Sequence, residues 1–223
     1  MAHGSRLYPV SLVVADRRCL VVGGGAVAAR KAQGLLECGA RVTVVAPDVV
    51  DELIRLAGPE GDRDAVERGG AAGGLTVERR PYRSPEAAGY RLVVTATGVP
   101  DVDHRVFLDA EAAGVWVNSA DDLDNCAFLL PAVHRDGPVT VAVSTAGASP
   151  ALAQWLRTRV AEAVGPDLGA LAGLLDEARA AVKASGRSTE GLDWPTALGA
   201  LVPLVRAGRM DEARAALAAF TAT

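Results

Sequence analysis

The sequence predicts an α/β fold in which a mostly parallel sheet is followed by a β-hairpin-containing connection and a helical C-terminal region. Three observations support this prediction. Short β-branched runs alternate with helical stretches in the first half of the chain, a glycine cluster separates the first run from the first helix, and the residues after Pro150 are rich in Ala and Leu. Alternating strands and helices produce a parallel sheet that is covered on both faces.

The first three elements are predicted to form a βαβ unit. Cys19–Val22 is a short apolar run typical of a buried strand, Val27–Glu37 has the pattern of a helix, and Arg41–Val45 is a second β-branched run. A crossover of this kind is what joins two parallel strands, because a short turn leaves neighbouring strands antiparallel.

Four more elements extend the predicted sheet. They are an edge strand, a buried strand, a helix and a last strand, at Leu75–Glu78, Leu92–Thr95, Asp101–Ala113 and Val115–Ser119, respectively. The stretch Gly58–Gly74 has too little apolar content to pack, so a mobile surface loop is predicted there.

The pattern changes after residue 120. Strands are expected at Phe128–Val133 and Val139–Ser144, on either side of a hairpin-like connection, His134–Pro138. Everything beyond Ser149-Pro150 is predicted to be helical. Breaks that divide this region into three or four helices are expected at Gly165-Pro166, Ser185–Ser188 and Pro203.

Composition excludes several classes of protein. A net charge of −4 and a pI near 5.4 argue against a nucleic-acid partner, which normally requires a basic surplus. The three cysteines form no CxxC pair, so neither a disulfide framework nor a zinc site is predicted. The residues before Asp16 lack the features of a secretion signal, and no apolar run has the length of a membrane span. A cytoplasmic protein is therefore expected.

The glycine cluster has the spacing of a dinucleotide-binding loop. The residues Gly23-Gly24-Gly25-Ala26-Val27-Ala28 fit G-x-G-x-x-A directly between a strand and a helix, so a Rossmann-type unit is predicted, with residues 23–27 against the cofactor. Gly23 permits the tight turn, Gly25 leaves room for the pyrophosphate at the helix N-terminus, and the small Ala28 allows close helix packing. The alternative is a tight turn that binds no ligand.

The second predicted strand ends at an acid that is positioned to bind the ribose of the cofactor. It ends at Pro47-Asp48, which places an acid about 20 residues beyond the glycines, where a ribose 2′-hydroxyl is recognised. A carboxylate there repels a 2′-phosphate, so Pro47 and Asp48 are predicted to contact NAD rather than NADP. The alternative is that Asp48 caps the next helix.

The strand Leu92–Thr95 is followed by a turn of small and hydroxyl-bearing residues. Ala96 and Thr97 lie at the carboxyl edge of the predicted sheet, where doubly wound folds bind their ligands. They are predicted to form part of the cofactor wall. An ordinary turn before the next helix is the alternative.

Three stretches together carry a family resemblance. They are Gly23–Ala32 (GGGAVAARKA), Val117–Asp121 (VNSAD) with Phe128 and Pro131 beyond it, and Val141–Pro150 (VAVSTAGASP). In this order and spacing, over Tyr8 to about Arg159, the chain resembles the precorrin-2 dehydrogenase / sirohydrochlorin ferrochelatase family, which includes the N-terminal module of bacterial sirohaem synthase.

The resemblance implies an activity and an assembly. The activity is NAD-dependent dehydrogenation of precorrin-2 to sirohydrochlorin, followed in some members by insertion of Fe²⁺ to give sirohaem. The assembly is a homodimer with the active site near the dimer cleft. The family's key acid, in an N-V-V-D pattern, falls on Asp121, where this sequence reads NSAD. Asp122 and Asp124 are the alternatives if the register differs.

The chemistry of the reaction fits an acid at this position. Transfer of a hydride from a reduced macrocycle to nicotinamide requires a proton to leave as well, and a carboxylate at the rim of the cofactor crevice accepts it. Asp121 follows the last predicted strand, at that rim, and Asn118 on the same strand is predicted to contact the substrate. The alternative is an ordinary Asp-Asp turn.

The third stretch is predicted to bind the substrate's carboxylates. Ser149 has the features of an N-cap with proline at the first helical position, and Ser144, Thr145 and Ser149 lie in the loop that leads to this helix start. Helix N-termini bind anions, and Arg157 and Arg159 add positive charge. The alternative is a well-capped helix and nothing more.

These expectations divide the chain into three parts: an NAD-binding domain (1–120), a strand and hairpin segment for dimerisation (121–150) and a helical domain (151–223). The helical domain is expected to supply much of a dimer interface, because its apolar content exceeds what so small a layer can hide.

Other residues and readings receive less support. His104 and His134 have no metal-binding spacing, so no protein-held metal is predicted, and Cys126 is expected to be a small buried residue rather than a ligand or reactive thiol. A different class is an NAD-sensing regulatory protein with a helical output region, which needs neither Asp121 nor an anion site. A dehydrogenase of small hydroxy acids is a third reading, but no His or Lys suited to its catalysis is obvious.

Overall fold

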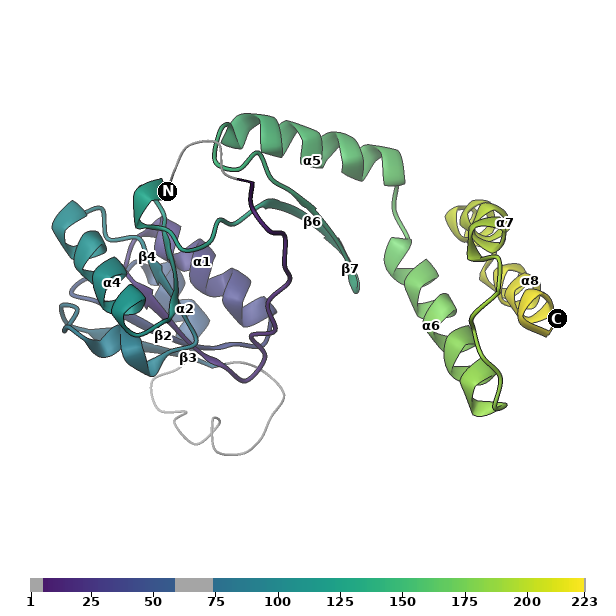
Figure 1. Ribbon diagram of the computed structural model, residues 1–223, viewed down its shortest axis with the longest axis horizontal. Helices are drawn as coiled ribbons and strands as arrows, with labels where there is room; N and C mark the ends of the chain where they lie inside the picture. The colour runs from purple at the N-terminus through teal and green to yellow at the C-terminus, as the bar shows by residue number, and fades with distance from the viewer. Residues whose placement is uncertain (1–5, 59–73, 223) are drawn as a thin grey trace. The chain divides into compact units, whose positions relative to one another are not determined.

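A computed structural model describes residues 6–58 and 74–222 (Figure 1). The loop predicted at Gly58–Gly74 lies outside the described residues, except for its first and last glycines. The chain divides into two compact units, Met1–Leu130 (unit 1) and Pro131–Thr223 (unit 2), which are taken in turn below.

Unit 1 contains a five-stranded parallel sheet in the order β3-β2-β1-β4-β5. The strands are β1 (Arg18–Val22), β2 (Arg41–Ala46), β3 (Leu75–Arg79), β4 (Leu92–Thr95) and β5 (Trp116–Ser119). The strand order reverses between β1 and β4, which is where doubly wound folds bind their ligands. The predicted α/β fold, the βαβ unit and the edge position of β3 are confirmed.

Helices cover both faces of this sheet. They are α1 (Ala26–Glu37), α2 (Asp51–Ala57) and α4 (Pro100–Ala112), with short 3₁₀ turns η1 (Glu86–Gly89) and η2 (Leu123–Asn125). Alternate residues of a strand point to opposite faces. Val21 accordingly joins one buried cluster with Ala28 of α1, whereas Leu20 joins another with Val106 of α4. The short helix α2 had no sequence prediction of its own.

Unit 2 begins with an antiparallel hairpin of β6 (Ala132–Asp136) and β7 (Val139–Val143), with Asp136 paired to Val139. The strand predicted at Phe128–Val133 therefore began too early, and the predicted connection His134–Pro138 was too long, because residues 134–136 belong to β6. The two-residue turn is possible because Gly137 has a φ of +54°. Helix α5 (Pro150–Val164) packs against both strands.

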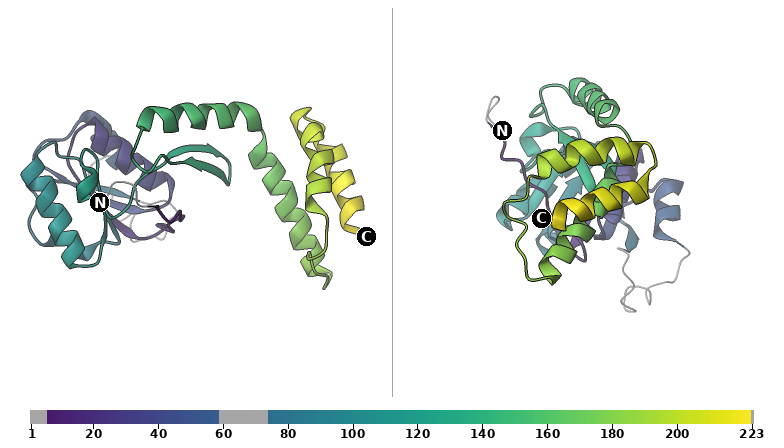
Figure 2. Two further views of the ribbon diagram at one scale, coloured as in Figure 1. Left: turned by 45° about the horizontal axis from the view of Figure 1, so that its top comes forward. Right: turned by 90° about the vertical axis from the view of Figure 1, so that its right-hand side faces the viewer.

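The rest of unit 2 is helical. Its helices α6 (Leu168–Ala184), α7 (Trp194–Arg206) and α8 (Met210–Ala222) share a buried cluster that includes Leu174, Leu201 and Leu217. Figure 2 shows α7 and α8 side by side. No helix in the described ranges is long and apolar enough to cross a bilayer.

Two of the three expected helix breaks are confirmed, at Gly165-Pro166 and at Ser185–Ser188. The break expected at Pro203 was wrong, because Pro203 lies inside α7. A proline removes one helical hydrogen bond, but Leu201 and Val205 on either side of it are both buried, and this packing holds the helix together. The chain turns instead at Gly208, which has a φ of +70°.

Candidate functional site

A pocket of about 520 Å³ opens at the carboxyl ends of the strands of unit 1. Four loops line it, one after each of β1, β2, β3 and β4. The lining residues are Val22 to Gly25, Val45 to Val50, Pro81 and Tyr82, and Thr97, Val99 and Val102. Of the residues predicted to contact the cofactor, this pocket brings together Gly23, Gly24, Gly25, Pro47, Asp48 and Thr97.

The first two glycines are required by the backbone that passes beside them. Gly23 has a φ of +129°, and a Cβ there would lie 2.3 Å from the carbonyl oxygen of Ala96. A Cβ on Gly24 would lie 1.8 Å from the carbonyl oxygen of Asp48. Ala96, predicted as cofactor wall, therefore meets the glycine turn through its own backbone. These contacts hold the loops after β2 and β4 against the turn after β1.

The third glycine is different, because a Cβ on Gly25 would meet nothing within 4 Å. Gly25 is the N-cap of α1 and makes no side-chain cap bond, and Ala26 and Val27 form the first turn of the helix. The first N–H groups of a helix have no partner within the helix, and its dipole favours an anion there. The open side of Gly25 thus leaves space for a phosphate at this end of α1.

Asp48 lies exposed in the turn after β2. The alternative that it caps the next helix is not supported, because the N-cap of α2 is Val50 and that cap makes no side-chain hydrogen bond. Its position at the end of β2, on the lining of the pocket, is the position from which an acid recognises a ribose.

The hydroxyls at the end of β4 are held by a buried acid on α4. Asp103 accepts hydrogen bonds from the hydroxyls of Thr95 and Thr97 and from the backbone N–H of Thr97, the last at 3.2 Å. The hydroxyl oxygen of Thr97 also accepts from the N–H of Val99 at 3.0 Å. The turn role of Thr97 is thus visible, and its contact with a cofactor stays a prediction.

Asp121 is exposed in the loop between β5 and η2, at the same edge of the sheet as the pocket. It does not line the pocket itself. The N–H of Ala120 donates to the carbonyl of Thr95 at 2.9 Å, which holds the start of this loop beside the end of β4. The buried amide of Asn118 donates to the carbonyl of Phe128 at 2.9 Å. Asn118 therefore braces the loop, and its predicted contact with the substrate stays a prediction.

The neighbouring acid Asp122 is used inside the loop. Its carboxylate accepts from the N–H of Asp124 and from the side chain of Asn125, each at 2.9 Å, and so caps η2. Asn125 in turn contacts Nδ1 of His104 at 2.9 Å, which ties the loop to α4. Asp122 is therefore engaged in bonds within the loop, and the role of Asp121 as the acid stays a prediction.

Two further groups lie beside this loop. Burial and the nearby charge of Arg30 lower the pKa of Lys31 on α1. Electrostatic interactions with Cys126 and Asp121 oppose this shift. Cys126 is buried, its sulfur lies 3.2 Å from the N–H of Ser119, and burial raises its pKa. It is a small buried residue, as expected. Lys31 was missed, because nothing in the sequence places this face of α1 against the loop after β5.

The predicted substrate residues of unit 2 form a hydrogen-bonded turn before α5. The hydroxyl of Ser149 accepts from the N–H of Leu152 at 3.2 Å, which confirms the N-cap. Thr145 Oγ1 accepts from the N–H of Ser149 at 3.1 Å, and the hydroxyl of Ser144 accepts from the N–H of Ala146 at 3.1 Å. The cap is thus visible, and binding of a substrate by these hydroxyls stays a prediction.

The two arginines of α5 differ. Arg159 pairs with Glu162 at 2.8 Å and lies over the ring of Trp155 at 5.6 Å. The Nε of Arg157 is buried and has no hydrogen-bond partner within the described parts of the chain. A buried guanidinium nitrogen without a partner is costly.

Nine lining residues were not predicted as cofactor contacts. They are Val22, Val45, Ala46, Val49, Val50, Pro81, Tyr82, Val99 and Val102. The sheet order places the loop after β3 next to the loop after β2, and this order is the signal that identifies Pro81 and Tyr82 as neighbours of Asp48. Strand order is not visible in a single sequence.

Comparison with known proteins identifies the family of the chain that forms this pocket. Residues 10–132 match the family model described as "Putative NAD(P)-binding", and residues 136–163 match "Sirohaem biosynthesis protein central". The chain belongs to this NAD(P)-binding family. The two adjoining matches confirm the predicted resemblance to the precorrin-2 dehydrogenase / sirohydrochlorin ferrochelatase family and the predicted class of cofactor.

Relatives of this family cover most of the chain. The "Siroheme synthase" of Acinetobacter baylyi is 38% identical over 178 residues, which are 80% of this chain and 36% of the relative. That of Chromobacterium violaceum is 38% identical over 213 residues, which are 93% of this chain and 42% of the relative. The chain thus spans about two fifths of the length of these curated relatives. The solved structure "SirC, precorrin-2 dehydrogenase" matches with a TM-score of 0.67 at 23% identity over 96% of each chain, which shows the fold.

Proposed function

We propose that the chain is an NAD-dependent precorrin-2 dehydrogenase that forms sirohydrochlorin in sirohaem biosynthesis. The observation that carries the proposal is the exposed Asp121 at the same edge of the sheet as a pocket lined by the glycine loop and Asp48. The names of the relatives, siroheme synthase and precorrin-2 dehydrogenase, supply the substrate class.

The pocket fits the cofactor in two places. The open side of Gly25 at the start of α1 suits the pyrophosphate, and Asp48 suits the ribose of the adenosine half. Because the adenosine half lies toward β2, the nicotinamide half lies toward β4 and β5, where Asp121 is located. When bound, the nicotinamide supplies the hydride acceptor.

Asp121 is the residue that takes the proton in this proposal. Loss of a hydride from the reduced macrocycle must be accompanied by loss of a proton, and an exposed carboxylate in a braced loop accepts it. Lys31 adds a positive charge beside Asp121, which suits a substrate that carries many carboxylates. We assign further carboxylate contacts to Asn118, Ser144, Thr145 and Ser149.

We extend the proposal to insertion of Fe²⁺ into sirohydrochlorin, with Fe²⁺ as a substrate. Within the described ranges, no group of three or more His, Cys, Asp or Glu side chains is arranged to hold a metal ion. Iron insertion also requires the pyrrole protons to leave, so the same carboxylate, Asp121, serves both reactions.

We also propose that the protein is a cytoplasmic homodimer, with the segment 121–150 and the helices after it as the interface. The buried cysteines Cys19 and Cys126 form no disulfide, as expected in a reducing compartment. In the described chain, β6 and β7 pair only with each other, and an isolated two-stranded sheet is marginally stable. Trp155 of α5 is 56% exposed and Leu152 is 47% exposed.

The test is to mix the protein with NAD⁺ and precorrin-2 and to record the visible spectrum over time. The expected result is a new chromophore, sirohydrochlorin, together with NADH absorbance in equal amount. Subsequent addition of Fe²⁺ should convert that chromophore to sirohaem. NAD⁺ binding without any change in the spectrum would contradict the proposal and favour an NAD-sensing regulatory protein instead.

A further inference from the structure

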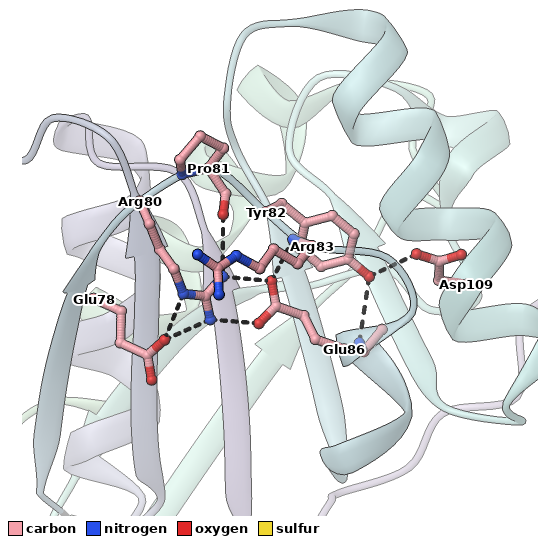
Figure 3. Close-up of polar contacts among 8 residues, drawn as sticks. Glu78, Arg80, Pro81, Tyr82, Arg83, Glu86 and Asp109 are labelled. Carbon is pink, nitrogen blue, oxygen red and sulfur yellow. Dashed lines mark hydrogen bonds and ion pairs between the residues drawn. The ribbon is translucent and has the colours of Figure 1, made fainter.

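Arg80, the first residue after β3, is enclosed by two carboxylates (Figure 3). Its Nε donates to Glu78 at 2.9 Å, and its Nη1 donates to Glu86 at 2.9 Å and to the carbonyl of Pro81 at 3.0 Å. Its Nη2 donates to Glu78 and, at 2.6 Å, to Glu86. A guanidinium has five N–H donors, and these five bonds use all of them.

The local sequence produces this arrangement. Residues two apart on an extended strand point to the same face, so Glu78 and Arg80 lie together at the end of β3. The turn that follows brings Glu86 back to the same guanidinium, and the backbone N–H of Arg83 fixes Glu86 with a bond of 2.6 Å. Side-chain exposure is only 21% for Arg80 and 19% for Glu86. The guanidinium is therefore held rigidly and shielded from water.

The electrostatics agree with this geometry. The hydrogen bonds that Arg80 donates to Glu86, and then those to Glu78, raise the pKa of Arg80 despite partial burial. Burial opposes ionisation of Glu86, but the bonds from Arg80 and Arg83 outweigh it and lower the pKa of Glu86. The three side chains therefore carry one positive and two negative charges, a net charge of −1.

This cluster adjoins the adenosine side of the pocket. The N–H of Arg80 donates to the carbonyl of Ala46 at 3.0 Å, and Ala46 is followed directly by Pro47 and Asp48. The next two residues, Pro81 and Tyr82, line the same pocket. The Tyr82 hydroxyl donates to Asp109 at 2.9 Å, which fixes this loop on α4. An arginine beside the acid that ends β2 is the kind of residue that accommodates a 2′-phosphate in NADP-binding proteins.

We propose that Glu78 and Glu86 lock Arg80 away from the pocket, and that this Glu78–Arg80–Glu86 lock makes the site reject a ribose 2′-phosphate. Arg80 is the cation that could bind a 2′-phosphate, and it lies at the end of the sheet next to Asp48. Its N–H donors are all occupied, however, and the two carboxylates outweigh its positive charge. The lock thus acts together with Asp48. The proposal deepens the proposed function, since it rests on a dinucleotide in this pocket.

The test is the affinity for NADP⁺ and NAD⁺, measured by calorimetry on the full chain. The double variant Glu78→Gln/Glu86→Gln keeps the size of both side chains and releases the charge of Arg80. One charged hydrogen bond to the phosphate then strengthens NADP⁺ binding by roughly 10- to 100-fold. Affinity for NAD⁺, which lacks that phosphate, stays within about twofold of the wild type by the same reasoning. The measurement needs no tetrapyrrole.

Two further variants identify the residue responsible. Adding Arg80→Met to the double variant should abolish the gain for NADP⁺. Glu212→Gln removes one charge from another two-bonded pair, Arg209–Glu212 at the start of α8, and should leave both affinities unchanged. This variant controls for the loss of a glutamate that is paired with an arginine outside unit 1.

The outcomes separate the lock from the cofactor assignment. Unchanged NADP⁺ affinity in the double variant, or equal losses for both dinucleotides, would overturn the lock while leaving the NAD site intact. A gain that persists after Arg80→Met would also overturn it, because another cation such as Arg79 or Arg83 would then hold the phosphate. If the wild type binds neither dinucleotide, the cofactor assignment and the lock fail together.

Discussion

Unit 1 and the hairpin segment of unit 2 (β6, β7 and α5) bury their apolar residues to very different degrees. In unit 1, central strand residues such as Val21, Val44 and Val93 are completely buried, and clusters fill both faces of the sheet. Among the described residues of the hairpin segment, Ala153 is the single apolar residue that is buried, and it belongs to none of the buried clusters. Both parts keep apolar side chains exposed, among them Trp116 of unit 1 and Trp155 of the hairpin segment, but within the described residues only unit 1 has buried clusters on both faces of its sheet.

Unit 1 and the hairpin segment should therefore control different properties of the protein. A unit with its own core and pocket can bind a dinucleotide by itself, so substitutions there should change binding or turnover and not association. A hairpin with half-buried strands and two unpaired edges gains stability by covering them, so substitutions there should change association first. Substitutions in each part can therefore test this separation.

Asp121→Asn should give the largest effect, on turnover. The substitution keeps the size of the side chain but removes its ability to accept a proton, and loss of a general base typically costs on the order of 100- to 10,000-fold in rate. NAD⁺ affinity should not change, because Asp121 lies outside the pocket, and the oligomeric state should not change, because the substitution keeps the size of an exposed side chain at the very start of the proposed interface segment. Initial rates with precorrin-2, calorimetry and sedimentation measure the three quantities.

Asp122→Asn is the matched control, since Asn retains an acceptor for the cap of η2. Its effect on turnover should be mild. Iron insertion, measured separately, should fall in Asp121→Asn as well. Full dehydrogenase activity in Asp121→Asn, with a loss in Asp122→Asn or Asp124→Asn instead, would move the base to that neighbour.

Gly25→Asp should abolish NAD⁺ binding in a protein that still folds. A Cβ at Gly25 meets nothing, so the fold tolerates the side chain, but its carboxylate occupies the phosphate position. Placing like charges together costs several kcal/mol, which corresponds to a loss of affinity of more than about 100-fold. Calorimetry gives the affinity, and thermal unfolding confirms the fold.

Gly23→Ala is the contrasting variant, because its Cβ would overlap the carbonyl of Ala96 at a positive φ. It should lower the unfolding temperature of unit 1 as well as NAD⁺ affinity. If Gly25→Asp bound NAD⁺ like the wild type, the phosphate would have to bind elsewhere than the start of α1.

The contrast between these two glycines also shows what the sequence could predict. The glycine spacing identified the turn and its ligand class, because a strand, a tight turn and a helix start each impose a residue type at a fixed position. Alternation of β-branched runs with helices gave the parallel sheet for a similar local reason. The same reasoning placed Gly25 toward the pyrophosphate, and its open surroundings agree.

Features that depend on distant packing were missed. The break expected at Pro203 ignored the buried residues on either side of it, and the hairpin turn was drawn too long because residues 134–136 have no distinctive strand pattern. Tyr82 and Lys31 join the site only through strand order and helix placement. The partners of Arg80 are local in sequence, but its position beside the end of β2 was missed because it depends on the pairing of β2 with β3.

Trp155→Glu should weaken association without changing NAD⁺ affinity. Trp155 is exposed on α5, and burial of an aromatic side chain in an interface typically contributes about 2 kcal/mol or more, so dissociation should become roughly 30-fold easier. Sedimentation over a range of concentrations measures the equilibrium. Arg55→Glu on α2, an exposed residue of unit 1 outside the proposed interface, is the control and should leave association unchanged.

A wild-type protein that is monomeric at micromolar concentration would contradict the dimer and, with it, the reading of the hairpin segment as incomplete. A dimer that resists Trp155→Glu but is lost on Val141→Arg would keep the dimer and move its centre from α5 to the hairpin. These results therefore determine whether α5 or the hairpin forms the centre of the dimer interface.

Asp48→Ala should give the smallest effect, a narrower preference for NAD over NADP. Removing one hydrogen bond to a ribose hydroxyl costs about 0.5–1.5 kcal/mol, so NAD⁺ affinity should fall by roughly 2- to 10-fold, and NADP⁺ should gain slightly from the lost repulsion. Because Asp48 and the Glu78–Arg80–Glu86 lock adjoin the same end of the pocket, their effects should not add independently when the variants are combined. Association should stay unchanged, since all four residues belong to unit 1. A wild type that prefers NADP would show that the acid after β2 does not select the cofactor, and it would leave Gly25 as the only tested contact of this pocket.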